Sequence, residues 1–170
     1  QEYHAASASA VVIDVATGEV LADVNQPAYN PNDRSQIKPA LFRNRAITDI
    51  IEPGSTFKPL IVAAALDSGR FNARSEIDTN PGFIRVGNKT IEDKHNLGRI
   101  DLTTILAKSS NVGIVHVVMQ LDKDMLWNTL SRFGAGRLTT SGFPGESAGV
   151  LAPYQSWRPI GQATLGYGYG

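Results

Sequence analysis

The most informative stretch of this chain reads Glu52-Pro53-Gly54-Ser55-Thr56-Phe57-Lys58-Pro59-Leu60. The Pro53-Gly54 pair interrupts any element before it, and the apolar residues that follow predict a helix from about Ser55 to Ser68. Ser55 would then lie in the first turn of this helix. Residues three apart in a helix share one face, so the amine of Lys58 should be able to reach the hydroxyl of Ser55.

A serine with a lysine partner is a known way to build an acylatable nucleophile. The first turn of a helix also offers unpaired backbone N–H groups and a partial positive charge, and both stabilise a developing oxyanion. Plainer interpretations exist as well. Ser55 can be a simple helix N-cap, Lys58 can be a solvated charge, and a four-residue Ser-x-x-Lys pattern occurs often by chance.

A second polar motif, Lys108-Ser109-Ser110-Asn111-Val112-Gly113, lies between two apolar runs, 100–107 and 114–121, which have the composition of buried helices. Three side chains able to form hydrogen bonds are unusual at such a turn. The plainer alternative is an N-cap for the second helix. Together with Ser55 and Lys58, however, this motif indicates a site.

The two motifs resemble the Ser-x-x-Lys and Ser-x-Asn pair of penicillin-binding proteins and serine β-lactamases. From Ala10 onward the chain is similar to the front part of the transpeptidase domain of class B penicillin-binding proteins, and most similar to the members that act at the division septum. Further stretches agree with this family in the same order: Val11-Val12-Ile13-Asp14 with Thr17-Gly18-Glu19-Val20-Leu21-Ala22, Tyr29-Asn30-Pro31-Asn32, Arg43-Asn44-Arg45-Ala46, Phe143-Pro144-Gly145-Glu146 and Tyr167-Gly168-Tyr169-Gly170.

The resemblance implies an incomplete domain. The family has a third motif, Lys-Ser-Gly or Lys-Thr-Gly, on a late strand, and neither tripeptide occurs here. We therefore expect residues 10–170 to form the first part of the transpeptidase domain, with 10–24 as a strand hairpin and 51–170 as a mainly helical lobe. Residues 1–9 would be a linker from an N-terminal module, preceded by a membrane anchor. The fragment alone is expected to be inactive.

The order of the predicted elements favours an α+β fold. Two β-rich runs, 10–15 and 19–24, are joined by residues 16–18, which predicts a hairpin. Residues 72–94 alternate turns with extended pieces and predict a small hairpin or lobe, whereas 43–50 is either a short helix or an extended approach. A hairpin followed by helices suits an antiparallel sheet packed against a helical lobe. The family fold has that arrangement, with a five-stranded sheet.

Three helices are predicted in the second half of the chain. Asp101 can cap the first of them. Residues 112–121 are apolar nearly all round, which predicts a buried helix. Residues 122–133 are amphipathic, and Gly134 is a stop signal at their end. The residues predicted on or near the apolar face of the first helix are Ile100, Ile105 and Leu106, and those of the last helix are Met125, Leu126, Leu130 and Phe133.

Composition excludes several classes of function. Lysine plus arginine and aspartate plus glutamate number 16 each, so nothing indicates nucleic-acid binding. The chain has no cysteine, which excludes disulfides, a thiolate nucleophile and a thiolate metal site. It also has no run of about 18 apolar residues that could span a bilayer. No cofactor and no metal are expected, because His95 and His116 lack partners at metal-ligand spacing.

The resemblance assigns roles to individual residues. Ser55 would be the nucleophile and Lys58 its base, with the pKa of Lys58 lowered by the helix start and by neighbouring side chains. Ser109 would relay a proton to the leaving group. Asn111 would orient Lys58 and hold a substrate carbonyl. Substrate binding is assigned to Glu52, Ser110 and Tyr169; the alternatives are a solvated acid at position 52 and a core or rim tyrosine at position 169.

The activity implied by the resemblance is peptidoglycan D,D-transpeptidation through a serine acyl-enzyme during cell division, at the periplasmic face of the inner membrane. The implied partners are stem peptides ending in D-Ala-D-Ala, β-lactams, and membrane proteins of the division complex, including a septal glycosyltransferase. Two alternatives stay open: a D,D-carboxypeptidase or serine β-lactamase, and a non-catalytic sensor or scaffold. Ser-Ser-Asn in place of Ser-Asp-Asn argues against a class A β-lactamase.

Overall fold

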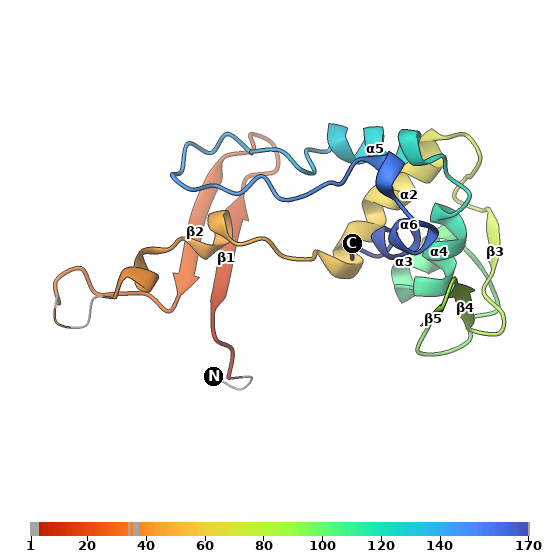
Figure 1. Cartoon of the computed structure of the whole chain (residues 1–170), viewed down its shortest axis with the longest axis horizontal. Helices are drawn as coiled ribbons and strands as arrows, with labels where there is room; N and C mark the ends of the chain where they lie inside the picture. The colour runs from red at the N-terminus through yellow and green to blue at the C-terminus, as the bar shows by residue number, and fades with distance from the viewer. Residues whose placement is uncertain (1–3, 34, 36–37, 170) are drawn as a thin grey trace. The chain divides into compact units, whose positions relative to one another are not determined.

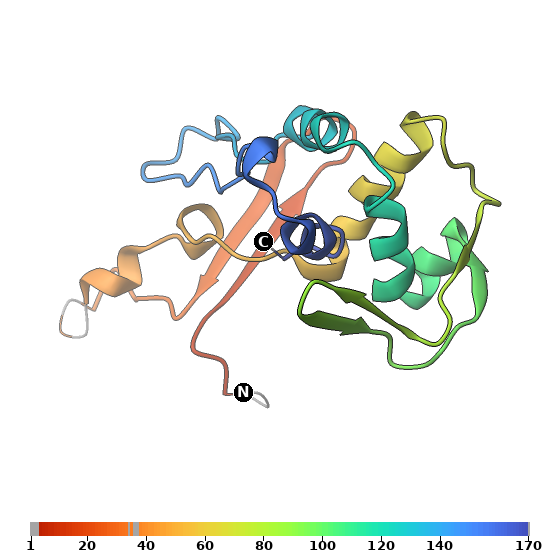
Figure 2. The same ribbon diagram turned by 45° about the vertical axis from the view of Figure 1, so that its right-hand side comes forward.

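The computed structural model describes residues 4–33, 35 and 38–169 and confirms an α+β fold (Figures 1 and 2). The chain separates into two compact units. The first comprises Gln1–Ile50 with Leu138–Ser147, and the second comprises Ile51–Arg137 with Ala148–Gly170. Both predicted catalytic motifs therefore lie within the second unit.

The first unit is built on a β-hairpin. Strands β1 (Ala8–Ile13) and β2 (Val20–Gln26) pair antiparallel, as predicted, although β1 begins earlier than residue 10. The carboxylate of Asp14 holds the turn between them, because it accepts from the backbone N–H groups of Ala16 and Thr17 at 2.8 and 2.9 Å.

This hairpin exposes its apolar side chains. Within the part of the chain that the structure describes, β1 and β2 form a sheet of two strands. Val12 lies opposite Ala22, and the next pair along, Val11 and Asp23, points to the other face, so both faces carry apolar groups. Seven side chains are each at least 45% exposed: Val11, Val12, Ile13, Val15, Val20, Leu21 and Val24. A two-stranded sheet of this kind is marginal by itself.

The rest of the first unit is largely irregular. It contains the 3-10 turn η2 (Pro39–Phe42) and the short helix α1 (Arg45–Thr48). Of the two alternatives for residues 43–50, the structure therefore has the short helix. The side chain of Asn25 in β2 accepts from the N–H of Ala46 at 3.1 Å. This bond satisfies one of the N–H groups that a helix start leaves unpaired.

The second unit carries the longer helices and two small sheets. The 3-10 turn η3 (Gly54–Phe57) leads directly into α2, as the sequence predicts for this helix. The α-helices are α2 (Lys58–Asp67), α3 (Leu102–Lys108), α4 (Asn111–Val118), α5 (Lys123–Arg132) and α6 (Pro159–Leu165), with the 3-10 turn η4 (Tyr154–Ser156) before α6. The sheets pair β3 (Glu76–Asp78) with β6 (Arg99–Asp101) and β4 (Phe83–Val86) with β5 (Lys89–Glu92).

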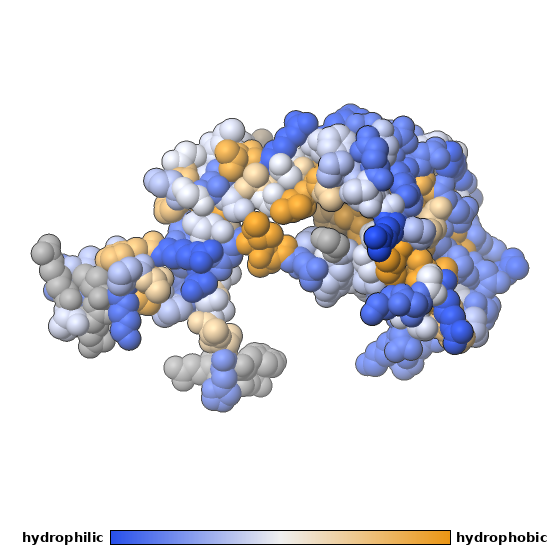
Figure 3. Space-filling view, viewed as in Figure 1, coloured by the Kyte–Doolittle hydropathy of each residue, from blue (hydrophilic) through white to orange (hydrophobic). Residues whose placement is uncertain are grey.

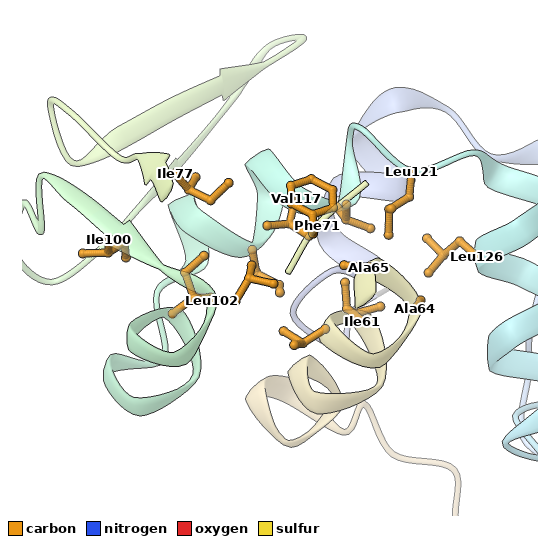
Figure 4. Close-up of a cluster of buried hydrophobic side chains, with 14 of the residues drawn as sticks. Ile61, Ala64, Ala65, Phe71, Ile77, Ile100, Leu102, Val117, Leu121 and Leu126 are labelled. Carbon is orange, nitrogen blue, oxygen red and sulfur yellow. The ribbon is translucent and has the colours of Figure 1, made fainter. Parts of the chain in front are cut away.

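The core of this unit forms around α2 and α4. In Figure 4, Ile61, Ala64 and Ala65 of α2 lie in one cluster of buried side chains. The same cluster includes Val117 of α4 and Leu126 of α5, both 0% exposed. Six of the eight residues of α4 are buried, which confirms the prediction of a buried helix.

A glycine allows α4 to approach α3 closely. A Cβ atom added to Gly113 would lie 2.7 Å from the side chain of Ile105, which is too close for any other residue without a shift. The glycine of the Ser-Ser-Asn-Val-Gly motif is therefore needed for packing. The same packing fixes how the N-terminus of α4 sits on α3.

Asp101 caps α3 as predicted, since its carboxylate accepts from the N–H of Thr104 at 2.7 Å. Ile100, predicted on or near the apolar face, is buried in β6, the strand directly before this helix. Two apolar-face predictions are wrong. Leu106 is 36% exposed. Phe133 is 58% exposed, because α5 ends at Arg132 and the chain turns away at Gly134, whose φ is +91°.

The space-filling view shows hydrophilic side chains over much of the visible face of the second unit (Figure 3). Among the described residues, none of the helices combines the length and the apolar character needed to cross a membrane.

Candidate active site

Lys58, the first residue of α2, is the centre of the site. Its side chain is 1% exposed, which is rare for a lysine. The amine donates to the carbonyl oxygen of Ser109 at 2.5 Å, to the hydroxyl oxygen of Ser109 at 3.0 Å and to Oδ1 of Asn111 at 2.8 Å. The structure thus brings together three of the predicted catalytic residues across more than 50 positions of sequence.

Ser109 reaches this position through an unusual backbone conformation. It is the C-cap of α3 and has φ 55° and ψ 40°, the left-handed region that non-glycine residues seldom occupy. In this conformation the carbonyl and hydroxyl oxygens of the same residue both accept from Lys58. Such strain at a polar cluster is typical of functional sites.

The environment of Lys58 changes its acidity. Burial removes water from the charged amine and lowers its pKa from 10.5 to about 8, against the opposing effect of the Asp93 carboxylate. The cause differs from the expected one, because burial and not the helix start is the main reason. An amine with this pKa is neutral in a useful fraction of molecules near neutral pH.

Ser55 lies in η3, one turn before Lys58, and is exposed. With Ser109 and Asn111 it lines a cavity of about 330 Å³. Among the described residues, no hydrogen bond joins the Ser55 hydroxyl to the Lys58 amine. In this state the three protons of the ammonium group are all donated to Ser109 and Asn111.

Ser110 does not have the predicted substrate-binding position. It is 1% exposed and is the N-cap of α4: its hydroxyl oxygen accepts from the N–H of Gly113 at 2.8 Å and its hydroxyl donates to Asp93 at 2.5 Å. Its hydrogen-bonding groups are thus used inside the protein. The plainer N-cap interpretation of this motif is correct for Ser110.

The positions of Glu52 and Tyr169 differ from those of the residues that hold Lys58. Glu52 is exposed, and neither residue is among those that line the cavity beside Ser55. Tyr169 is 47% exposed, its ring centroid lies 5.6 Å from that of Tyr167, and its hydroxyl would lie 3.6 Å from a Cβ added to Gly54. Tyr169 therefore lies beside the segment that leads to the nucleophile.

Sequence reasoning missed Asp93. Its carboxylate accepts from Ser110 and from the backbone N–H groups of Asn111 and Val112. It follows a short strand in an otherwise polar loop, where an aspartate is unremarkable. His95 lies on the same cavity wall, and the described residues contain no group of three or more histidine, cysteine, aspartate or glutamate side chains arranged to hold a metal.

This site lies in a chain whose residues 8–170 match the family model of the penicillin binding protein transpeptidase domain. The chain therefore belongs to that family. It is 43% identical over 166 residues to the peptidoglycan D,D-transpeptidase FtsI of Escherichia coli (strain K12), a match that covers 98% of this chain and 28% of the relative. It is 42% identical over 170 residues to the probable peptidoglycan D,D-transpeptidase PenA of Neisseria gonorrhoeae, covering 99% of this chain and 29% of the relative.

A solved structure agrees with these matches. The apo TP domain of penicillin-binding protein 3 from Burkholderia pseudomallei has a TM-score of 0.86 and 38% sequence identity, over 99% of this chain and 46% of that chain. The family resemblance drawn from the motifs is thus confirmed. The present chain spans less than a third of the length of the two curated relatives.

Proposed function

We propose that this chain is the nucleophile-bearing part of a serine D,D-transpeptidase that cross-links peptidoglycan stem peptides. The observation that carries the proposal is the state of Lys58, whose buried amine has a pKa lowered to about 8 one helical turn after an exposed serine. Such an amine can accept the proton of a serine that attacks a carbonyl. Family membership and the names of the relatives support the choice of substrate.

Acylation would begin with neutral Lys58. The Ser55 oxygen attacks the carbonyl carbon of the D-Ala-D-Ala peptide bond while its proton passes to the Lys58 amine. The backbone N–H of Ser55 would stabilise the oxyanion as one of its donors. The C–N bond then breaks as the Ser109 hydroxyl, which lies 3.0 Å from the Lys58 amine, gives its proton to the departing amine of D-Ala and takes up the proton held by Lys58. An ester on Ser55 remains.

An amine from a neighbouring stem peptide would complete the reaction by attacking this ester, so that Ser55 regains its proton and a new peptide bond forms. Asn111 would hold a substrate carbonyl through its Nδ2 group, because its Oδ1 is occupied by Lys58. A β-lactam would acylate Ser55 in the same way, but its leaving nitrogen stays attached, so the ester persists. Tyr169 and Glu52 would contribute to the outer part of the substrate site.

The cellular setting belongs to the same proposal. Residues 1–9 would link the domain to an N-terminal module and a membrane anchor, and the site would work at the periplasmic face of the inner membrane. Its partners would be division-complex membrane proteins, including a septal glycosyltransferase. Similarity to FtsI supports this setting.

The assignment of the nucleophile has a direct test. A fluorescent penicillin should label the full-length protein covalently, and Ser55→Ala should remove the label because the ester cannot form. Ser68→Ala is the matched control, since Ser68 lies at the other end of α2 and its hydroxyl bonds to the backbone of Ala65 and Arg70. Labelling of Ser55→Ala at the wild-type rate would show that another residue is acylated.

The same protein separates transfer from hydrolysis. A transpeptidase should open one equivalent of nitrocefin and keep the opened product bound as the ester on its serine. Sustained steady-state turnover would instead identify a β-lactamase.

A further inference from the structure

Asp93 joins the polar loop after β5 to the motif that holds Lys58. Its Oδ2 accepts from the Ser110 hydroxyl at 2.5 Å. Its Oδ1 accepts from the backbone N–H groups of Asn111 at 2.5 Å and Val112 at 3.1 Å. One carboxylate therefore holds three consecutive residues at the N-terminus of α4, where helix N–H groups otherwise lack partners.

The Lys58 amine is held by Ser109 and Asn111. Ser109 directly precedes the three residues that Asp93 holds, and Asn111 is one of them. We propose that Asp93 is a positioning residue for acylation at Ser55: it fixes the turn at 110–112 so that Ser109 and Asn111 keep the amine of Lys58 in place. This inference rests on the function proposed above, but it concerns a residue that touches neither the substrate nor the nucleophile.

The charge of Asp93 provides a second line of support. The charged or titratable side chains that line the cavity beside Lys58 are Asp93, Lys94, His95 and Lys108. Asp93 is the acidic member of this set, and it raises the pKa of Lys58 against the effect of burial. Loss of its charge should therefore lower the pKa of Lys58, and the neutral amine should become available at a lower pH.

The test measures the second-order rate of acylation by a fluorescent penicillin across pH in the full-length protein. Asp93→Ala removes the carboxylate, and Asp93→Asn keeps an oxygen for the two N–H groups but removes the charge. Asp101→Ala is the matched control, because Asp101 also accepts from a backbone N–H at the start of a helix, but at the opposite end of α3 from Ser109. Thermal melting shows whether each variant folds, and Asp93→Asn decides the question if Asp93→Ala does not.

We expect Asp93→Ala to acylate on the order of 10²-fold more slowly, because small misplacements of a catalytic group have effects of this size. Asp93→Asn should lose roughly tenfold. In both, the pH of half-maximal rate should fall, whereas in Asp101→Ala it should stay unchanged. If Asp93 were a helix cap without a role in acylation, its replacement would reduce stability but leave the pH of half-maximal rate unchanged.

Two results would overturn the proposal: Asp93→Asn acylating within about threefold of wild type, or a slower Asp93→Asn with an unchanged midpoint. Ser55→Ala is measured alongside. If Ser55→Ala still labels, the proposed function itself fails. If Ser55→Ala is not labelled while the Asp93 variants are labelled at the wild-type rate, only the proposed role of Asp93 is wrong.

Discussion

Lys58 is buried and its amine donates three hydrogen bonds. Burial and hydrogen bonding change the pKa of the amine in opposite directions. Loss of hydration favours the neutral form, whereas oxygen acceptors favour the ammonium. Burial dominates, so the pKa lies at about 8. In the neutral form the amine gives up one donated bond and gains a lone pair that can serve Ser55.

The pH dependence of acylation follows from this pKa. The rate should rise about tenfold per pH unit below the pKa of Lys58 and level off above about 8, because only the neutral amine accepts the proton. Lys58→Arg keeps the charge but cannot lose its proton, so it should be slower by on the order of 10² or more at every pH. Stopped-flow acylation measured between mildly acidic and alkaline pH gives the profile. A rate independent of pH across this range would exclude Lys58 as the base.

Side-chain roles within one motif could be predicted only in part. Ser109 and Asn111 were predicted correctly to meet Lys58, because the motif as a whole carries that information. Ser110 was not, because the direction of each side chain depends on the left-handed backbone at Ser109, which no local pattern of a serine indicates. The role of Asp93 could not be predicted either, because its hydrogen-bond partners come from a distant segment of the sequence.

The backbone just after α6 and the start of η3 form a close contact. Gly168 has φ +83°, and its carbonyl oxygen accepts from the N–H of Gly54 at 3.2 Å. A Cβ added to Gly168 would lie 2.2 Å from the carbonyl oxygen of Gly54. Gly168 and Tyr169 thus support the backbone next to Ser55.

Gly168→Ala should therefore slow acylation by on the order of 10²-fold, because it must displace the residue that precedes the nucleophile. Gly161→Ala is the matched control, since it lies in α6 with open space around its Cβ position and should acylate normally. Labelling rates of the two folded variants provide the comparison. Equal rates would mean that the backbone at Gly54 does not control the position of Ser55.

Elements with strong periodicity could be predicted well. The hairpin, the helix after Ser55 and the buried α4 all agree with the structure, because their apolar patterns are long and their ends carry Gly, Asp or Pro signals. The small sheets were harder. β3 and β6 pair across more than 20 residues, and strands of three residues carry too little pattern to predict such pairing.

Across the whole molecule, the two units differ in how far their apolar side chains are buried. The second unit has a cluster of buried apolar side chains, whereas the apolar side chains of the β1–β2 hairpin are largely exposed. Exposed apolar strands with free edges favour association with other chains or with further strands.

The polypeptide of these 170 residues should therefore self-associate as its concentration rises. The pair Val12→Thr and Val24→Thr, on one face of the hairpin, should reduce this while keeping good strand formers. Replacing Leu66 and Phe133, which are 44% and 58% exposed in the second unit, with glutamine is the control and should change association little. Analytical ultracentrifugation distinguishes the three proteins. A wild-type polypeptide that stays monomeric at all concentrations would contradict the expectation.

At Ser109, selection for stability and selection for activity favour different residues. Its left-handed backbone costs about 1 kcal/mol or more, and glycine would adopt the same conformation without that cost. Screening for heat tolerance would reward glycine here, yet glycine lacks the hydroxyl that accepts from Lys58. Thermostable variants gathered without an activity check should thus accumulate inactive members at this position.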